Sequence, residues 1–427
     1  MLIILFFILP WNLGKHFEQS SSLVNTSVIP YLIPTLYLQD IVVVAIVALL
    51  FQKERGTFKG DGHALRLFFL FIVAAFLSVF FADRFYPSGY FFVRLLLYFL
   101  FFLASINSFR SSSVRRWFFV SLALNLFLLS VLGFLQFYKQ SSVFNNYLFF
   151  GEQPYNVFTP FIAKESFSGV TKIPPYATFL HPNIFAGYLA VSLILLLGYF
   201  LTGKKRRVVP SAFFVLIGVV ALFLTKSYTA WAAFVLGLLL LSLARPVSVK
   251  SVKDARLITS ILLFLAFATV LLGLLFPSYK NLVVTALPAD SITSTLSVER
   301  RSALLNASYK MVSQKPFFGW GINSFTYSFE PFYTRFDVVR FLQPVHNVYA
   351  LIAAEVGILG AVLFLLLTFY TIYRSTCRGG FLYSVALIQV VFLSSFDHYF
   401  FTIPQTQLLF ILTLIMGLTY TGDSSCL

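Results

Sequence analysis

The sequence has few charged residues and very few cysteines. Charged side chains make up 11% of its 427 residues, whereas hydrophobic ones make up 59%. A soluble domain carries roughly 25% charged residues, so this chain has too little polar surface to cover a globule in water. Its 2 cysteines, Cys377 and Cys426, provide neither a disulfide framework nor a metal-binding spacing. These absences exclude an ordinary soluble enzyme and favour an integral membrane protein.

Familiar catalytic signatures are absent as well. The sequence contains no H-E-x-x-H, no phosphate-binding P-loop and no G-x-S-x-G. Carboxylates are scarce in the segments expected outside the membrane, which disfavours a caged catalytic metal. The net charge of +16 could suggest nucleic-acid binding, but the basic residues gather in short connectors between apolar runs. That placement is typical of membrane topology, and we expect no nucleic-acid partner.

Long apolar runs dominate the chain. A membrane-spanning helix needs about 20 mostly apolar residues, and the first run is short enough to be a partial span. It has neither the basic start nor the small-residue cleavage site of a signal peptide. We predict an all-α, polytopic integral membrane protein with about 12 transmembrane helices, forming a single membrane domain over residues 1–427. The runs fall near residues 2–13, 34–51, 65–82, 89–106, 117–138, 180–201, 208–224, 228–244, 257–276, 347–373, 381–396 and 404–420.

Basic residues occur in every second connector between these runs. The positive-inside rule places such connectors in the cytoplasm, so both termini should be cytoplasmic. The two longest extracytoplasmic loops should then be residues 277–346 and residues 139–179. The basic connector residues are Lys53, Arg55, Lys59, Arg110, Arg115, Arg116, Lys204, Lys205, Arg206, Arg207, Arg245, Lys250, Lys253, Arg256, Arg374 and Arg378.

The larger loop, residues 277–346, contains one clear helix signal. Ser297 is a suitable N-cap, Glu299 would lie in the first turn, and Lys315 stands near the expected end. Apolar residues recur at helical spacing, so we expect an amphipathic helix lying on the membrane with Arg301 at headgroup depth.

Two adjacent arginines in this helix are candidates for binding a diphosphate. A guanidinium is planar and always charged, so it can donate two parallel hydrogen bonds to phosphate oxygens. Arg300 and Arg301 would then engage the anionic part of a lipid-linked substrate. The alternative is a snorkelling pair that anchors the helix to lipid headgroups.

His346 is the candidate general base. It follows Pro344 closely, and we expect it in the first turn of the tenth apolar run. The positive end of a helix disfavours imidazolium, so the ring should be neutral and able to take a proton from an attacking hydroxyl. The alternative is a polar capping residue at the helix entrance.

Other polar residues gather at the same predicted outer face. His181 and Asn183 open the sixth apolar run, where they could contact substrate or simply start the helix. Arg94 lies in the outer part of the fourth run, and an ionisable residue inside a span is a functional candidate unless it snorkels to the interface. Asp397 and His398 follow the eleventh run, where they could orient another group or form an interfacial polar turn.

Several short motifs follow one another in a fixed order along the chain. They are H-P-N at 181–183, Arg-Arg at 300–301, P-x-x-G-x-G at 316–321, N-S-F at 323–325, H-N-x-Y at 346–349 and E-x-G-I-x-G at 355–360. Each is weak by itself, but their order and spacing together resemble the O-antigen ligase and O-antigen polymerase family of bacterial membrane glycosyltransferases. The resemblance is densest over residues 297–361.

The resemblance implies transfer of a glycan from a polyprenyl (undecaprenyl) diphosphate carrier to an acceptor hydroxyl. It implies no nucleotide sugar, no metal and no other cofactor. Arg301 looks like the loop arginine that engages the diphosphate, with Arg300 as the second choice. His346 looks like the histidine that activates the acceptor, and Asn347 completes its H-N pair as a candidate substrate-binding residue.

One position departs from the family pattern. The family often has Ser-Arg at the outer start of a span, and here Lys226-Ser227-Tyr228 stands in that place. Tyr228 therefore replaces the arginine, and Lys226 could supply the cation from two residues earlier.

These inferences predict a multi-pass protein of the cytoplasmic (inner) membrane with an extracytoplasmic active site, acting in cell-surface polysaccharide or lipopolysaccharide biosynthesis. Its partners would be a lipid-linked glycan donor, a glycan, lipid or protein acceptor, and membrane lipids. O-antigen ligase, O-antigen polymerase and protein O-oligosaccharyltransferase activities all fit. A lipid-linked glycan transporter or flippase is the alternative from another class; polar residues gathered at one face, rather than at the midplane, disfavour it. A non-catalytic structural protein would leave the Arg-Arg and His-Asn pairs without a purpose.

Overall fold

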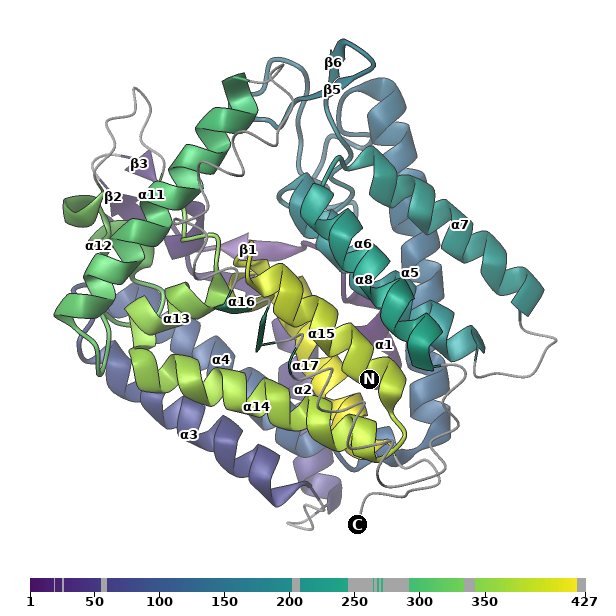
Figure 1. Ribbon diagram of the computed structural model, residues 1–427, viewed down its shortest axis with the longest axis horizontal. Coiled ribbons are helices and arrows are strands. Elements are labelled where there is room, and N and C mark those ends of the chain that lie inside the picture. Colours follow the sequence, from purple (N-terminus) through teal and green to yellow (C-terminus); the bar gives the residue numbers. More distant parts are fainter. Residues whose placement is uncertain are drawn as a thin grey trace.

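The computed structural model describes residues 1–18, 20–24, 27–54, 60–201, 208–244, 292–333 and 342–420, with isolated positions from 264 to 271. It is mostly helical with a few short strands (Figure 1). Several expectations lie outside the described residues. They are most of the apolar run 257–276, the basic connectors at 204–207 and 245–256, Arg55 and Lys59, and loop segments 277–291 and 334–341.

Within the described part of the chain, 5 helices are long and apolar enough to cross a membrane. They are α3 (Gly62–Val79), α4 (Phe85–Ser105), α5 (Ser112–Lys139), α6 (Pro182–Leu201) and α14 (Ile358–Cys377). Shorter apolar helices add to them, so a multi-pass membrane protein is supported, while a total of twelve spans is not confirmed. The shorter ones are α2 (Leu38–Glu54), α7 (Val208–Leu224), α8 (Tyr228–Ala244), α15 (Phe381–Ser394) and α17 (Pro404–Thr419).

The first apolar run is not a span. Its helix α1 (Leu2–Ile8) has 7 residues and is therefore only about 10 Å long. The Phe6 ring packs edge-on against Phe109 at 5.7 Å and Phe118 at 5.4 Å between centroids. The run is apolar because it fills space beside α5.

The tenth apolar run is two helices rather than one. α13 (Val348–Val356) ends and α14 begins at Gly357, whose φ is 92°. A Cβ on Gly357 would lie 2.0 Å from the carbonyl oxygen of Phe317, so glycine is required on both conformational and steric grounds. His346 consequently does not lie in the first turn of a long span. It precedes Asn347, the N-cap of the short helix α13.

The loop helix begins earlier than its capping signal predicts. α11 runs from Ile292 to Gln314, so Ser297 lies inside it and Glu299 is beyond its first turn. The buried side chains of Leu304, Leu305 and Met311 belong to the same core as α13, which α11 contacts. The apolar face of α11 is therefore covered by protein, and the expectation that this face lies on lipid is wrong.

Three antiparallel strand pairs and several single turns complete the described elements. β1 (Gly14–His16) pairs with β4 (Thr35–Tyr37), β2 (Leu23–Val24) with β3 (Ser27–Val28), and β5 (Glu165–Phe167) with β6 (Val170–Lys172). None of these strands was predicted: β4 lies at the start of the apolar run 34–51, and the others lie in expected loops. The turns are η1 (Ser20–Ser22), η2 (Pro30–Leu32), η3 (Ser108–Arg110), α12 (Phe325–Ser328), η6 (Glu330–Phe332) and α16 (Tyr399–Thr402).

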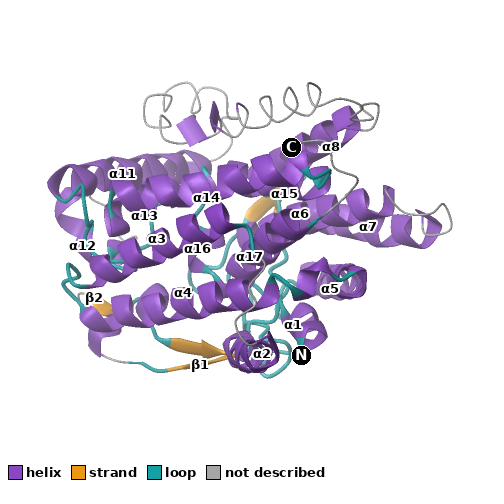
Figure 2. Cartoon of the chain, turned by 90° about the horizontal axis from the view of Figure 1, so that it is seen from below, coloured by secondary structure: helices purple, strands orange, loops and turns teal. Residues whose placement is uncertain are grey.

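The helix α13 occupies a central place in the fold. It contacts α11 on one side and α14 and α3 on others, and its neighbourhood includes α16 (Figures 1 and 2). α16 in turn contacts α15 and α17. The N-terminal end of α13 therefore meets the turn that joins α15 to α16, and this junction carries the candidate site.

Candidate active site

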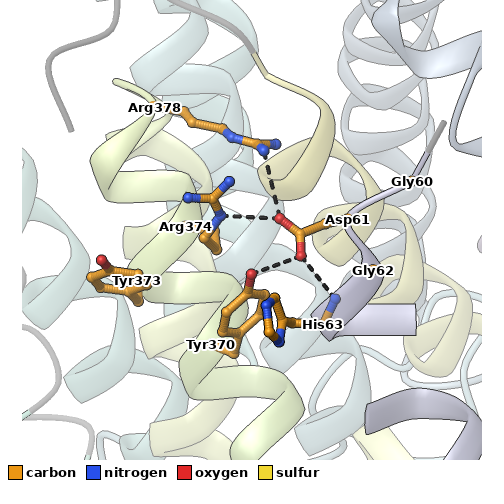
Figure 3. Close-up of a pocket in the computed structure, with 8 residues that line it drawn as sticks. All are labelled: Gly60, Asp61, Gly62, His63, Tyr370, Tyr373, Arg374 and Arg378. Carbon is orange, nitrogen blue, oxygen red and sulfur yellow. Dashed lines mark hydrogen bonds and ion pairs between the residues drawn. The ribbon is translucent and has the colours of Figure 1, made fainter. Parts of the chain in front are cut away.

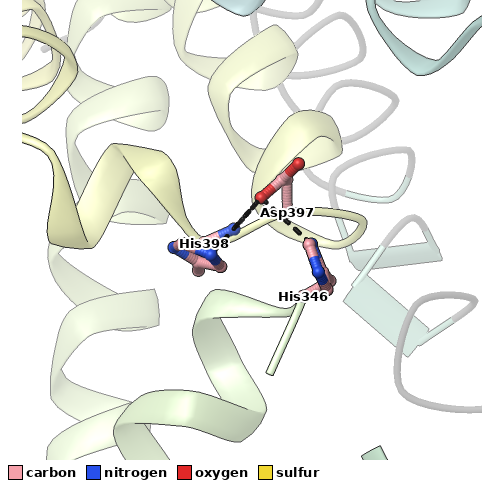
Figure 4. A group of neighbouring side chains, drawn as sticks. All are labelled: His346, Asp397 and His398. Carbon is pink, nitrogen blue, oxygen red and sulfur yellow. Dashed lines mark hydrogen bonds and ion pairs between the residues drawn. The ribbon is translucent and has the colours of Figure 1, made fainter. Parts of the chain in front are cut away.

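The site is built from two chain segments that are far apart in sequence. His346 stands just before α13, and Asp397 stands in the turn between α15 and α16. The Nδ1 atom of His346 lies 3.3 Å from Oδ1 of Asp397. His398 follows, with Nε2 at 3.9 Å from the same carboxylate oxygen. Figure 4 shows these three side chains pointing toward one another.

Asn347 fixes the two segments to each other. Its side-chain oxygen accepts a hydrogen bond from the backbone N–H of Ala350 at 2.9 Å, which caps α13. Its side-chain nitrogen donates to the carbonyl oxygen of Ser395 at 3.0 Å, two residues before Asp397. Asn347 is buried, and these bonds hold the position of His346 relative to Asp397.

The charges of the pair follow from its surroundings. Burial by itself raises the pKa of Asp397, but His346, His398 and Arg301 together hold that pKa well below its usual range. Burial, reinforced by Arg301, lowers the pKa of His346, against the opposing effect of Asp397. At neutral pH the pair is therefore an ionised carboxylate beside a neutral imidazole.

The protonation of the ring can be assigned from this state. An ionised carboxylate only accepts hydrogen bonds, so Nδ1 of His346 must carry the proton that it donates to Asp397. The lone pair of the neutral ring is then on Nε2, which makes no hydrogen bond among the residues that the structure describes. This is the arrangement of a general base whose partner carboxylate orients it.

His398 completes the cluster without sharing the role of His346. Burial lowers the pKa of His398 to about 3, so the ring is neutral. Its Nδ1 is 2.7 Å from the hydroxyl of Thr402, and its ring packs 5.4 Å from that of His346 and 5.3 Å from that of Tyr31. These contacts make His398 a buried packing partner of the catalytic candidate.

Arg301 brings positive charge to the same place. Its charge acts on His346, Asp397, His398 and His181, so its guanidinium lies near all four. Arg301 is partly buried, yet it forms no hydrogen bond or ion pair within the described part of the chain. Among the residues that the structure describes, its donors therefore face no competing acceptor, and the partly buried Arg300 stands beside it on α11.

The His-Asp-His cluster also has the composition of a metal site. Ligand atoms of His346, Asp397 and His398 all lie within 4.8 Å of one another. Zinc accepts imidazole and carboxylate ligands in this number. The expectation of metal-independent chemistry therefore needs a direct experimental test.

The glycine motif serves the fold of the site. Main-chain N–H groups of Trp320 and Gly321 donate to the carbonyl oxygens of Ala354 and Glu355 at 2.9 Å each. Added Cβ atoms on Gly319 and Gly321 would lie 2.4 Å from the backbone carbon of Glu355 and 2.3 Å from Ala82. The P-x-x-G-x-G segment therefore approaches protein backbone, not a ligand.

The Glu355 side chain completes this attachment. Its two carboxylate oxygens accept hydrogen bonds from the backbone N–H groups of Asn323 and Phe325, at 2.9 Å each. Burial raises the pKa of Glu355 to about 7, although these backbone donors oppose the change. The P-x-x-G-x-G, N-S-F and E-x-G-I-x-G motifs are therefore parts of one clamp that holds α13.

The structure does not bring Arg94 to the cluster. Its guanidinium forms a buried ion pair with Asp40, at 3.3 Å from Oδ2, and donates to the carbonyl oxygen of Thr35. It also lies over the rings of Tyr37 and Tyr90, at 4.9 and 4.7 Å from their centroids. Arg94 thus joins α4 to the start of α2, although its buried Nε makes no hydrogen bond among the described residues.

Lys226 and Tyr228 make no contact with the His346–Asp397 cluster among the contacts that the structure describes. The Lys226 ammonium is 5.0 Å above the Phe167 ring, and its charge acts on Glu165 of the β5–β6 hairpin. Tyr228 is 64% exposed and its ring packs 5.2 Å from that of Trp231. These residues belong to the junction of α8 with the 139–179 segment.

His181 has both a capping contact and a place near the cluster. Its Nδ1 accepts a hydrogen bond from the backbone N–H of Asn183 at 3.2 Å, at the start of α6. The charges of Asp397 and Arg301 also reach His181. Asn183 contributes its backbone here, and its side chain is partly buried.

Some contributors to the site were not foreseen. Tyr31 and Thr402 contact His398, and neither was a sequence candidate. Thr402 could have been found, because it follows His398 by four residues and so shares its helical face. Tyr31 could not, because its contact depends on the packing of distant segments.

Residues 212–365 match the family model described as O-antigen ligase. The matched stretch contains Arg300, Arg301 and His346, whereas Asp397 and His398 lie beyond its end. No curated protein matches the chain significantly. The resemblance expected from the motifs is confirmed, because this match is consistent with the O-antigen ligase family of membrane glycosyltransferase-like enzymes.

Proposed function

We propose that this protein transfers a glycan from a polyprenyl diphosphate carrier to an acceptor hydroxyl. The observation that carries the proposal is that a guanidinium with no hydrogen bond among the described residues exerts its charge on a carboxylate-bound imidazole beside α13. Transfer to a hydroxyl needs a proton acceptor for the nucleophile and positive charge for the leaving diphosphate. His346 with Asp397 supports the first requirement, and Arg301 supports the second.

In the proposed reaction, the oxygen of the acceptor hydroxyl attacks the anomeric carbon of the carrier-linked glycan. Nε2 of His346 takes the hydroxyl proton while the new carbon–oxygen bond forms. Asp397 is the positioning residue. Its negative charge stabilises the imidazolium, and its hydrogen bond with Nδ1 of His346 keeps Nε2 on the side of the ring away from Asp397. Base catalysis of this kind contributes about 10²–10⁴-fold to the rate.

The second half of the reaction is departure of the diphosphate. The bond between the anomeric carbon and the diphosphate oxygen breaks, and its electron pair leaves with the carrier. Arg301 donates hydrogen bonds to this developing charge, with Arg300 beside it as a second cation. Such charge stabilisation is usually the largest single contribution to catalysis. Arg94 has no part in this step, because Asp40 already holds it.

The proposed setting is the outer face of the cytoplasmic membrane. Basic residues in alternate connectors support cytoplasmic termini and outward-facing loops at 139–179 and 277–346. A carrier such as undecaprenyl diphosphate would then present its headgroup beside α11. The acceptor is a glycan, a lipid such as a lipopolysaccharide core, or a protein, corresponding to ligase, polymerase or O-oligosaccharyltransferase activity.

Reconstitution of the full chain in liposomes tests the proposal. The donor is a polyprenyl-diphosphate oligosaccharide, and candidate lipid, glycan and peptide acceptors are supplied in separate reactions. Matched reactions contain a nucleotide sugar in place of the donor, or a chelator. The measured products are the glycosylated acceptor and the released carrier diphosphate.

The proposal predicts equal amounts of glycosylated acceptor and released carrier, with no product from the nucleotide sugar. Movement of intact donor across the bilayer without either product would instead identify a transporter and contradict the proposal. Product formation that stops with chelator and returns with zinc would retain glycosyl transfer and replace its metal-free mechanism.

A further inference from the structure

A second polar site lies where the end of α14 meets the start of α3 (Figure 3). α14 has 20 residues and is therefore about 30 Å long. The site is at the opposite end of this helix from Gly357 and the clamp that holds α13. It is an open hollow of about 570 Å³. Its lining residues are Gly60, Asp61, Gly62, His63, Tyr370, Tyr373, Arg374 and Arg378.

Asp61 organises one wall of the hollow. Its carboxylate accepts hydrogen bonds from the Tyr370 hydroxyl at 2.7 Å and from Nε of Arg374 at 3.0 Å. It also accepts from Arg378 at 3.5 Å and from the backbone N–H of His63 at 3.2 Å, which caps α3. Burial alone would raise the pKa of Asp61, but the bonds from Tyr370 and Arg374 lower it overall.

The hollow retains positive charge after this pairing. One carboxylate faces two guanidiniums, and the charge of Arg110 reaches Arg378 as well. Only Nε of Arg374 is bound to Asp61, and its two terminal nitrogens make no hydrogen bond to a residue that the structure describes. Figure 3 shows these nitrogens turned away from Asp61, with Tyr373 on the same helix.

We propose that this hollow binds a phosphate group, carried either by an anionic lipid headgroup or by a soluble phosphate ester. Guanidinium groups suit phosphate oxygens because they donate in a planar fork and remain charged. Basic pockets between membrane helices on the cytoplasmic side are typical sites for anionic headgroups. The connector that contains Arg374 and Arg378 is on that side by the positive-inside rule.

This site does not depend on the proposed glycosyl transfer. The donor diphosphate would bind beside Arg301, whereas the hollow is at the other end of α14. The simpler interpretation is that Asp61 and the two arginines only join α3 to α14. That interpretation predicts a stability effect from mutation but no selective binding of phosphate.

His63→Glu separates the two interpretations. The side chain of His63 lines the hollow, while only its backbone bonds to Asp61, so the substitution adds negative charge without removing the ion pairs. Arg378→Gln removes one cation directly. Arg116→Gln is the matched control, because Arg116 is an exposed arginine outside the hollow.

The experiment uses the full chain in an uncharged detergent. Dihexanoyl phosphatidylglycerol, dihexanoyl phosphatidylcholine and glycerol 3-phosphate are titrated separately, and binding is measured by microscale thermophoresis and by the shift in the unfolding midpoint. We expect phosphatidylglycerol to bind and phosphatidylcholine not to bind. Like-charge repulsion should weaken binding about tenfold or more in His63→Glu, while Arg116→Gln behaves as the wild type.

Competition between glycerol 3-phosphate and phosphatidylglycerol identifies the source of the phosphate. Competition by glycerol 3-phosphate at similar concentration supports a site for soluble phosphate esters, and its failure to compete supports a lipid headgroup site. The inference is overturned if no anionic probe binds, or if anionic probes bind equally to wild type, His63→Glu and Arg378→Gln. A lower unfolding midpoint in Arg378→Gln without a change in affinity would leave only the structural role.

Discussion

Replacing Asp397 by asparagine tests the proposed chemistry at one atom. The substitution preserves the size of the side chain and removes its negative charge. The introduced amide can also donate a hydrogen bond, which favours the tautomer of His346 with its lone pair on Nδ1. Both changes act against proton transfer to Nε2, and neither removes the residues proposed to bind the diphosphate.

The expected loss can be worked from the geometry. With 3.3 Å between Nδ1 and Oδ1 and an effective dielectric constant of about 20, an imidazolium and a carboxylate attract by about 5 kcal/mol. The neutral amide offsets part of this loss by hydrogen bonding. We therefore expect kcat to fall by about 10²–10⁴-fold, or about 3–5 kcal/mol in activation free energy.

The assay measures initial rates in liposomes across a pH series. Wild-type activity requires neutral His346, so it should fall as pH drops through the pKa of that residue, which burial lowers from its ordinary value. Asp397 opposes this lowering, so its loss lowers the pKa further. The acid limb of the Asp397→Asn profile should therefore move to lower pH, while the KM for donor changes little.

Asp83→Asn is the matched control, because Asp83 is an exposed carboxylate between α3 and α4. It should retain kcat within about twofold, as expected of a surface substitution. Wild-type kcat in Asp397→Asn, or an acid limb that moves to higher pH, would refute the reasoning. Equal unfolding midpoints for the three proteins would show that the comparison concerns catalysis.

Three further predictions concern charge, fold and metal. Arg301→Ala should lower the rate by about 10²–10³-fold. Because Arg301 lowers the pKa of His346, the acid limb of the pH profile should also move to higher pH. An unchanged pH profile would show that the guanidinium does not act on His346. Gly357→Ala should lower stability by more than about 2 kcal/mol, because its Cβ would lie 2.0 Å from the Phe317 oxygen. Gly169→Ala, also at positive φ but with nothing within 4 Å, should cost only about 1 kcal/mol, as measured by thermal unfolding in detergent. Chelator should leave the transfer rate within about twofold, and a zinc-reversible loss of activity would instead assign the His-Asp-His cluster to a metal.

Helices could be predicted from the sequence where the length of an apolar run was the only signal that decided their bounds. The helices α3–α8 follow uninterrupted apolar runs that lipid or neighbouring helices can cover. The break at Gly357 was missed because an apolar run continues through it, and only the packing of Phe317 makes the glycine necessary. The start of α11 was missed because tertiary contact extends this helix beyond the capping signal at Ser297.

The sequence predicted which residue types form the site better than it predicted which side chains contact one another. The motifs indicated Arg301 and His346, and in the structure the charge of Arg301 acts on the His346 ring. Asp397 was a candidate without an assigned partner, because 51 residues separate it from His346. The charge of Arg94 was read as functional, since its buried partner Asp40 lies 54 positions away in another apolar run.

The most direct test of the account is glycan transfer by His346→Ala under single-turnover conditions, with donor already bound to the reconstituted protein. The account predicts wild-type donor affinity and a loss of about 10²–10⁴-fold in the rate of product formation, with His63→Ala behaving as the wild type. Product formation by His346→Ala at the wild-type rate would contradict the claim that this imidazole accepts the proton.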